Sequence, residues 1–170
     1  MAAGAAKSLA FTLLALNLVL YIIVSIIAGW ALNYGLDNTP QTVAQMSTPA
    51  HLFPLYFPIG NSATAFFIIF SLIAGLVGIA TSLAGINNII QWTVPNLLSA
   101  ASNSIATWAL TLLAMGLACK EINIGGRDGQ LRALETFTII LSGTQLFCMG
   151  AIQAGVTDAM DRQKIHGGRV

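Results

Sequence analysis

The chain has 170 residues, of which 56% are apolar and only 8% are charged. A soluble domain carries roughly 25% charged residues, so most of this chain's surface must lie in lipid, and the length leaves no room for a separate soluble catalytic domain. The formal net charge of +1 is not gathered into a basic stripe and gives no support to a nucleic-acid-binding surface.

The first apolar run predicts a retained membrane-spanning helix over about residues 9–32. It is longer than the apolar core of a cleaved signal peptide, which covers about 7 to 15 residues. Residues 33–58 are expected to form a loop, and they hold four of the five prolines. Within this loop, residues 51–58 are aromatic and apolar, which favours an anchor in the interfacial aromatic belt with the Tyr56 hydroxyl in water. The alternative is a lid over a pocket, with His51 as a hydrogen-bond donor.

Three further spans are predicted, over about residues 61–83, 102–118 and 133–155. The connection between the second and third spans, residues 85–101, carries no charge, and residues 156–170 are expected to form a short polar tail. These elements predict an all-α membrane protein, a four-transmembrane-helix bundle with a Pro- and aromatic-rich first loop. Residues 1–170 are then a single membrane domain, surrounded by the lipid bilayer.

An even number of spans places both termini on the same side of the membrane. The basic residues on that side are Lys7, Arg162, Lys164 and Arg169, and those on the other side are Lys120, Arg127 and Arg132. The positive-inside rule therefore favours cytoplasmic termini by a single charge.

Each predicted span carries a stripe of small or polar residues spaced three and four apart, so that they share one helix face. In the first, third and fourth spans these residues are Asn17, Tyr21, Ser25, Gly29, Asn103, Ser104, Thr107, Thr111, Thr138, Ser142, Gln145 and Gln153. In the second span they are Ser71, Ala74, Gly75, Gly78 and Ser82. Polar groups facing lipid would be unsatisfied, so the stripes are expected to face one another. The row of small residues packs either within the bundle or between copies, which leaves a homo-oligomer open.

The polar interior has two interpretations. One is packing, in which buried amides hydrogen-bond across helices for about 0.6 to 2 kcal/mol each; this interpretation is favoured. The other is a pocket or path for a small solute. The candidate ligand-binding residues are Asn17, Tyr21, His51, Tyr56, Asn61, Asn103, Thr107, Trp108 and Gln145.

The distribution of charge narrows the kinds of transport that are compatible with the sequence. No Asp, Glu, Lys or Arg occurs between Asp37 and Lys120. Proton- and ion-coupled carriers need a titrating or ion-binding residue at membrane depth, so active transport is disfavoured. A passive carrier and a protein that transports nothing are both compatible with this distribution of charge. Arg132 and Glu135, one turn apart, are expected to be an ordinary interfacial pair.

Other chemistry finds no support in the sequence. His51 and His166 have no partners at the spacing of metal ligands, and no serine lies in a recognisable nucleophile signature. Neither a metal, a cofactor nor an enzymatic activity is therefore expected. Cys119 and Cys148 do not form a disulfide-framework pattern and are expected to act as small apolar side chains.

The segment Pro49–Asn61, which reads PAHLFPLYFPIGN, resembles the AWPM-19-like family of plant plasma-membrane proteins. The similarity extends over most of the chain, through Ala63-Thr64, Phe70–Gly75, Ala80–Leu83, Lys7-Ser8 and Gly29–Ala31. The resemblance implies a small four-span protein of the plant plasma membrane, induced by abscisic acid, drought and cold. Facilitated uptake of abscisic acid has been proposed within the family. The resemblance assigns no ligand-binding residues to this chain.

Two hypotheses follow for the function. The first is a passive carrier (an influx facilitator) or binder of abscisic acid, a small amphipathic carboxylate that amide, Lys or Arg donors would hold. The second is a structural tetraspan that protects or organises the membrane during dehydration and cold. A continuous cavity lined by the polar stripes would favour the carrier, whereas a dry, tightly packed bundle would favour the structural protein.

Overall fold

The computed structural model describes residues 2–43, 60, 63–126 and 128–167. These residues form four helices, α1 (Ala2–Val43), α2 (Thr64–Gln91), α3 (Val94–Ile124) and α4 (Gly129–Gly167). At 1.5 Å per residue, even α2 with its 28 residues is longer than the roughly 30 Å of a bilayer core. All four helices are long and apolar enough to cross a membrane, which confirms the predicted all-α membrane bundle.

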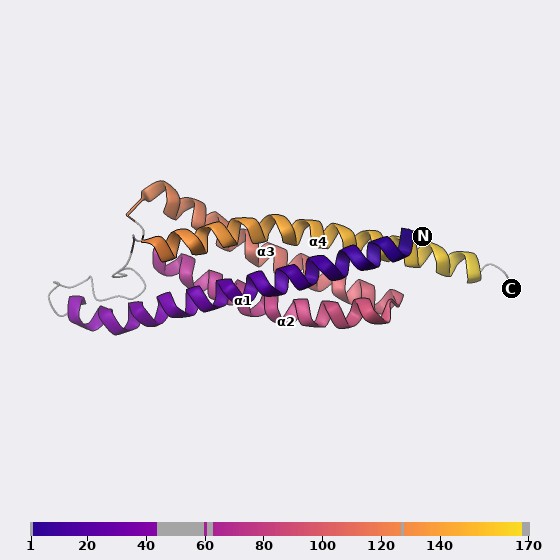
Figure 1. Cartoon of the computed structure of the whole chain (residues 1–170), viewed down its shortest axis with the longest axis horizontal. Coiled ribbons are helices and arrows are strands. Elements are labelled where there is room, and N and C mark those ends of the chain that lie inside the picture. Colours follow the sequence, from indigo (N-terminus) through magenta and orange to yellow (C-terminus); the bar gives the residue numbers. More distant parts are fainter. Residues whose placement is uncertain (1, 44–59, 61–62, 127, 168–170) are drawn as a thin grey trace.

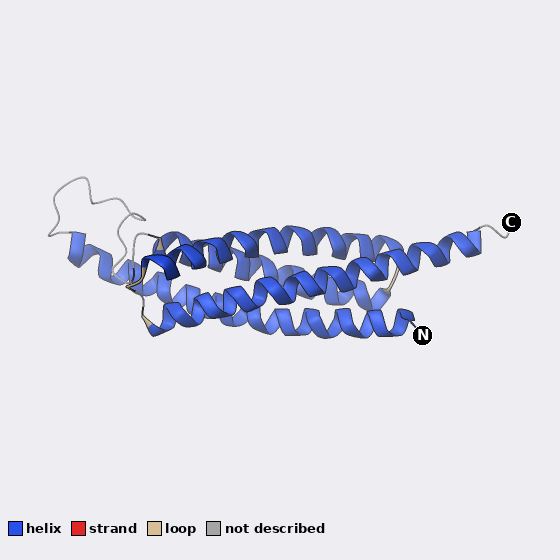
Figure 2. Ribbon diagram, turned by 90° about the horizontal axis from the view of Figure 1, so that it is seen from above, coloured by secondary structure: helices blue, strands red, loops and turns tan. Residues whose placement is uncertain are grey.

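The four helices lie side by side, and each packs against two neighbours. α1 contacts α2 and α4, and α3 contacts the same two helices, so the contacts close a ring. Figures 1 and 2 show the helices running up and down along one long axis, with both chain ends at the same end of the bundle. We call this the terminal end; the α2–α3 turn also lies there. The opposite end, where α1 leads to α2 and α3 leads to α4, is the loop end.

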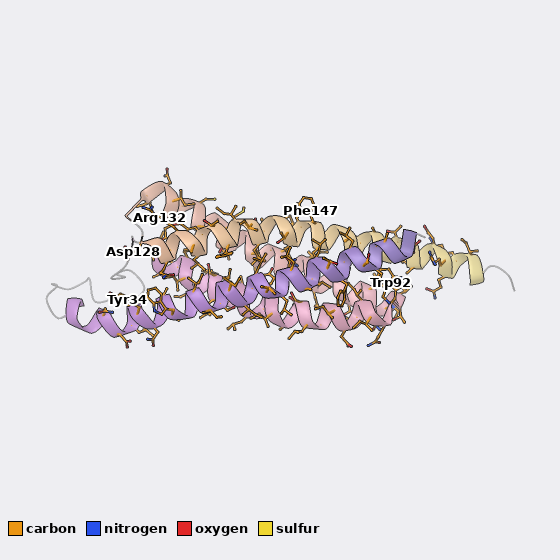
Figure 3. The ribbon with its side chains drawn as sticks, viewed as in Figure 1. Tyr34, Trp92, Asp128, Arg132 and Phe147 are labelled. Atoms are coloured by element: carbon orange, nitrogen blue, oxygen red, sulfur yellow. The ribbon has the colours of Figure 1, made fainter. Side chains whose placement is uncertain are left out.

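The side chains are arranged with polar groups inside and large apolar groups outside. Phe147 is 70% exposed and Ile26 is 66% exposed, and Figure 3 shows Phe147 pointing away from the bundle. Inside, one apolar cluster lies toward the loop end around Val24, Phe67 and Leu134. A second lies toward the terminal end and includes Leu14, Ile89, Leu97 and Ile152. Most of the buried polar side chains, such as Asn17, Thr107 and Gln145, lie between these clusters, an arrangement suited to a lipid surround rather than to water.

The helices extend into segments for which the sequence predicted connections, and this prediction was wrong. Residues 33–43 continue α1, and the charge-free connection of residues 85–101 is helical except for Trp92 and Thr93. α4 likewise continues through most of the expected polar tail, to Gly167. The Asn38 side chain lies against this added part of α1, where its Nδ2 donates to the Tyr34 carbonyl (2.8 Å). The physical reason for the longer helices is that a helix satisfies its own backbone groups in water as well as in lipid, so polar residues alone do not end it.

The α2–α3 turn is short because Trp92 adopts a left-handed conformation, with φ of 47°. This reverses the chain direction within two residues. Pro95 then lies in the first turn of α3, where its missing N–H costs nothing. Asn96 Nδ2 donates to Gln91 Oε1 across the turn (2.7 Å). The predicted Pro- and aromatic-rich first loop falls largely outside the described residues.

Candidate functional site

The centre of the bundle is crossed by a chain of buried amides from three helices. Asn17 Nδ2 on α1 donates to Gln145 Oε1 on α4 at 2.8 Å. Gln145 Nε2 in turn donates to the hydroxyl of Ser104 on α3 at 3.2 Å. All three side chains are buried, so each bond forms in a medium without competing water. We call Asn17, Gln145 and Ser104 the amide layer.

A layer of hydroxyl groups lies next to it. The Tyr21 hydroxyl on α1 bonds to Thr111 Oγ1 on α3 at 2.9 Å, and either oxygen can be the donor. Thr107 Oγ1 lies 2.9 Å from Thr81 Oγ1 on α2. Trp108 is part-buried, and its Nε1 donates to the Ser142 carbonyl on α4 at 3.2 Å. These bonds join all four helices through polar side chains, so the layer resists separation of the helices.

The polar interior is closed in this structure. The void lined by Thr81, Ser82, Ser104 and Gln145 measures about 10 Å³. That volume holds at most one water molecule, whereas small-molecule sites usually measure about 300 to 1,000 Å³. The predicted interior stripes therefore meet as packing surfaces without a ligand-sized space between them.

The row of small residues on α2 explains how α1 approaches so closely. Ser71, Ala74, Gly75, Gly78 and Ser82 are all buried. A Cβ atom at Gly78 would lie 2.3 Å from the Tyr21 ring, and one at Gly75 would lie 2.3 Å from Ser25 Oγ. Small residues thus let the Tyr21 ring fill the space beside the α2 backbone. This row therefore packs within the bundle, which is one of the two alternatives that the sequence left open; the other was packing between copies of the chain.

The structure brings together four of the nine predicted candidate residues as buried groups, namely Asn17, Tyr21, Thr107 and Gln145. Trp108 joins them through its indole N–H. Asn103 is only half-buried. Its backbone carbonyl, and not its side-chain amide, accepts a hydrogen bond from Thr107 Oγ1 at 2.8 Å. His51, Tyr56 and Asn61 lie outside the described residues. Gln153 was expected to face the interior but is exposed, because its position on α4 turns away from the buried face.

Two acidic residues near the loop end are buried, although the sequence predicted the burial of neither. Glu121 on α3 is fully buried, and its Oε1 accepts from the hydroxyl of Thr64 on α2 at 2.7 Å. Glu135 on α4 is 3% exposed, so it is not the surface member of an interfacial pair, whereas Arg132 is exposed. Glu121 lies three residues after the buried Ala118 on α3. This helical spacing continues the inner face of α3 past the predicted end of the span and is the sequence signal for the burial of Glu121.

The two cysteines lie in different surroundings. Both are free thiols; Cys148 is buried on α4, and Cys119 is exposed near the end of α3. The Cys148 thiol lies beside the Asn17 amide, inside the polar layers.

A larger cavity, of about 380 Å³, opens at the terminal end of the bundle. Its lining residues are Gly4, Lys7, Trp92, Val94, Ala159 and Arg162. Figure 3 shows Trp92 at this end, opposite to Asp128 and Arg132 at the loop end. We call it the terminal cavity. None of its lining residues was among the predicted site residues, because they come from three separate segments of the chain.

Comparison with known proteins gives one family and one curated relative. A model described as the AWPM-19-like family matches residues 15–155. The protein named "Membrane protein PM19L" from rice, Oryza sativa subsp. japonica, is 39% identical over 158 residues, covering 91% of this chain and 82% of the rice protein. The matched range includes the amide layer and the hydroxyl layer. No solved structure matches the chain.

Proposed function

Because the chain belongs to the AWPM-19-like family, we propose that this plant membrane protein is a structural tetraspan that organises and protects the plasma membrane during dehydration and cold. The whole chain acts as one four-span domain, with both termini in the cytoplasm. The link to dehydration and cold comes from the family resemblance. The closed interior favours a structural role.

The observation that carries this proposal is the size of the space between the polar stripes. About 10 Å³ remains where Thr81, Ser104 and Gln145 meet, which is far below the volume of a small-molecule site. Passage of a hormone-sized solute would require the helices to separate. Separation would break the Asn17–Gln145 and Tyr21–Thr111 bonds, which would leave buried polar groups unsatisfied in lipid.

The structural role can be tested by drying and rehydrating vesicles that contain the purified protein and a trapped fluorescent dye. We expect these vesicles to retain more dye than vesicles with an equal mass of an unrelated four-helix membrane protein. The expected reason is that a rigid bundle with an apolar outer surface keeps neighbouring lipids in place. Equal retention in the two preparations would contradict the structural proposal.

A passive carrier of abscisic acid is the second candidate, and one atom in the amide layer favours it. Asn17 Oδ1 is buried and accepts no hydrogen bond of ordinary geometry from the described residues. The acid group of a protonated carboxylic acid could donate to this oxygen, and the charge-free surroundings would suit a neutral solute. This candidate requires an open state that the closed bundle does not contain.

Uptake of labelled abscisic acid into liposomes at several external pH values distinguishes the two candidates. The structural proposal predicts uptake no faster than with the unrelated four-helix protein. Saturable uptake that unlabelled hormone competes away would establish the carrier instead. In that case Asn17→Leu should reduce uptake more than Asn103→Leu, because only Asn17 has its amide in the buried layer.

A further inference from the structure

The terminal cavity has a positively charged wall. Lys7 Nζ donates to the Ile90 carbonyl at 3.0 Å and lies 5.6 Å from the centre of the Trp92 ring. An ammonium group has three N–H donors, so this bond leaves Lys7 able to donate to a ligand. Arg162, on the other wall, forms an ion pair with Asp158 at 3.1 Å and brings a second positive charge to the cavity.

Two helix N-termini add to this positive potential. Gly4 lies in the first turn of α1, and Val94 is the first residue of α3; both line the cavity. The N–H groups of a first helical turn have no acceptor within their own helix, and the helix dipole is positive at that end. Thr93, which precedes α3, forms no side-chain capping bond to these N–H groups. Two side-chain cations and two helix ends thus converge on one cavity, a combination that selects an anion.

Asp158 offsets the charge of Arg162 through their ion pair, but the charged residues described at the terminal end are positive overall. The charged residues described at the terminal end are Lys7, Asp158, Asp161, Arg162 and Lys164. The three bases outnumber the two acids. Lys7 and Arg162 line the cavity itself, and neither acid is among the lining residues.

The depth of the cavity in the membrane identifies the kind of anion. Lys7 directly precedes the apolar run of α1 that begins near Leu9, and Trp92 occupies the turn between two spans. Tryptophan and lysine at span ends lie at the level of the lipid headgroups. Basic pockets between membrane helices are suited to anionic headgroups. We infer that the terminal cavity binds the phosphate headgroup of an anionic phospholipid.

This inference goes beyond the proposed structural role, because a headgroup site does not depend on whether the bundle carries a solute. Lys7 and Arg162 would contact the phosphate oxygens, and the first-turn N–H groups of α1 and α3 would lie at the same anion. The Trp92 ring packs toward α4, where the absence of a side chain at Gly155 makes room for it. The ring therefore forms a fixed wall of the site and can report on its occupant.

Quenching of Trp92 fluorescence by brominated lipids tests the inference at the site itself. The protein would carry Trp30→Phe and Trp108→Phe, which leaves Trp92 as the single tryptophan. It would be reconstituted in a fixed mixture of phosphatidylglycerol and phosphatidylcholine, with the bromine on one lipid or on the other at equal content. We expect brominated phosphatidylglycerol to quench Trp92 more strongly, because this lipid is enriched at the cavity. A basic side chain near anionic lipid is worth about fivefold in association, so Lys7→Gln and Arg162→Gln should each lower the preference about fivefold.

Matched variants at the loop end control for net charge. Lys120→Gln and Arg132→Gln remove the same charge from exposed positions far from the cavity and should leave the preference unchanged. Quenching by brominated phosphatidylcholine should rise in the Lys7 and Arg162 variants, because this lipid then takes the vacated place, and should stay constant in the two loop-end variants. The rise checks that Trp92 remains in place. Equal quenching by the two lipids in the unsubstituted site would overturn the inference. So would an equal loss of preference in the loop-end variants, or displacement of the lipid by excess inorganic phosphate, which would identify a site for free anions.

Discussion

The Asn17 side chain joins two helices, although a buried amide at this position could equally be a ligand-binding residue. It is fully buried, and it joins α1 to α4 through Gln145 at 2.8 Å. A buried amide in lipid has few alternatives to its partner, so this bond stabilises one arrangement of the helices. The sequence could assign Asn17 to the interior, but it could not say whether a partner or a solute would meet it there.

We predict that Asn17→Leu lowers the stability of the bundle by about 0.6 to 2 kcal/mol. The replacement leaves the buried Gln145 amide without its partner on α1. Circular dichroism in increasing amounts of dodecyl sulfate would measure the loss, and Gln145→Leu with the double variant would give the coupling energy of the pair. Asn103→Leu is the matched control, because the half-buried Asn103 contributes only its backbone carbonyl to Thr107. Equal losses in the Asn17 and Asn103 variants would contradict the packing role.

The residues that the sequence located correctly share one property. Asn17, Tyr21, Thr107 and Gln145 stand out as polar positions in apolar runs, so periodicity alone places them inside. Glu121 and Lys7 lie where the apolar pattern fades, and the sequence gives no measure of their burial or neighbours. Their contacts to Thr64 and to the Ile90 carbonyl join segments far apart in the chain, which periodicity cannot predict.

The α1–α2 interface is the clearest case in which element packing depends on residue size. Gly78 faces the Tyr21 ring, and the Tyr21 hydroxyl is held by Thr111 on α3. The ring therefore cannot move away from α2 without losing its bond to α3. Overpacking at such a site usually costs about 1 to 3 kcal/mol.

We predict that Gly78→Ala destabilises the bundle, although alanine is the better helix former. The added Cβ would lie 2.3 Å from the ring, so α1 and α2 must move apart. The midpoint of thermal unfolding in detergent would measure the effect. Gly116→Ala is the matched control, since a Cβ there has nothing within 4 Å. A Gly78→Ala variant as stable as the Gly116→Ala variant would show that the interface is looser than described.

Helix ends were less predictable than helix faces. The sequence shows where each apolar run ends, and the length of that run reflects the thickness of the bilayer. The helices themselves continue beyond the apolar runs, because backbone hydrogen bonding does not require apolar side chains. Residues 33–43 and 156–167 are helical and largely polar. The α2–α3 turn depends on the left-handed conformation of Trp92, which is uncommon outside glycine and has no clear signature in the sequence.

At the scale of the whole molecule, the bundle is a ring of four helices with its polar groups in the centre. Composition and four apolar runs were sufficient to predict this class of fold, because a chain with so little charge can satisfy its backbone in lipid only as helices or as a closed barrel. The width of the interior was not predictable. It depends on how closely Tyr21 packs against the small residues of α2 around Gly78. It also depends on the hydrogen bonds that Gln145 forms with both Asn17 and Ser104.

The two native cysteines report directly on whether the interior of the bundle is closed. In a Cys119→Ser variant, only Cys148 remains, and it lies buried beside Asn17. In a Cys148→Ser variant, only the exposed Cys119 remains. Both variants would be reconstituted in liposomes and treated with a charged, membrane-impermeant maleimide, with and without abscisic acid. We predict that Cys119 reacts in the folded protein, whereas Cys148 reacts only after unfolding in dodecyl sulfate. Reaction of Cys148 in the folded protein at a rate similar to that of Cys119, with or without the hormone, would contradict a closed structural bundle and show a water-accessible path through its centre.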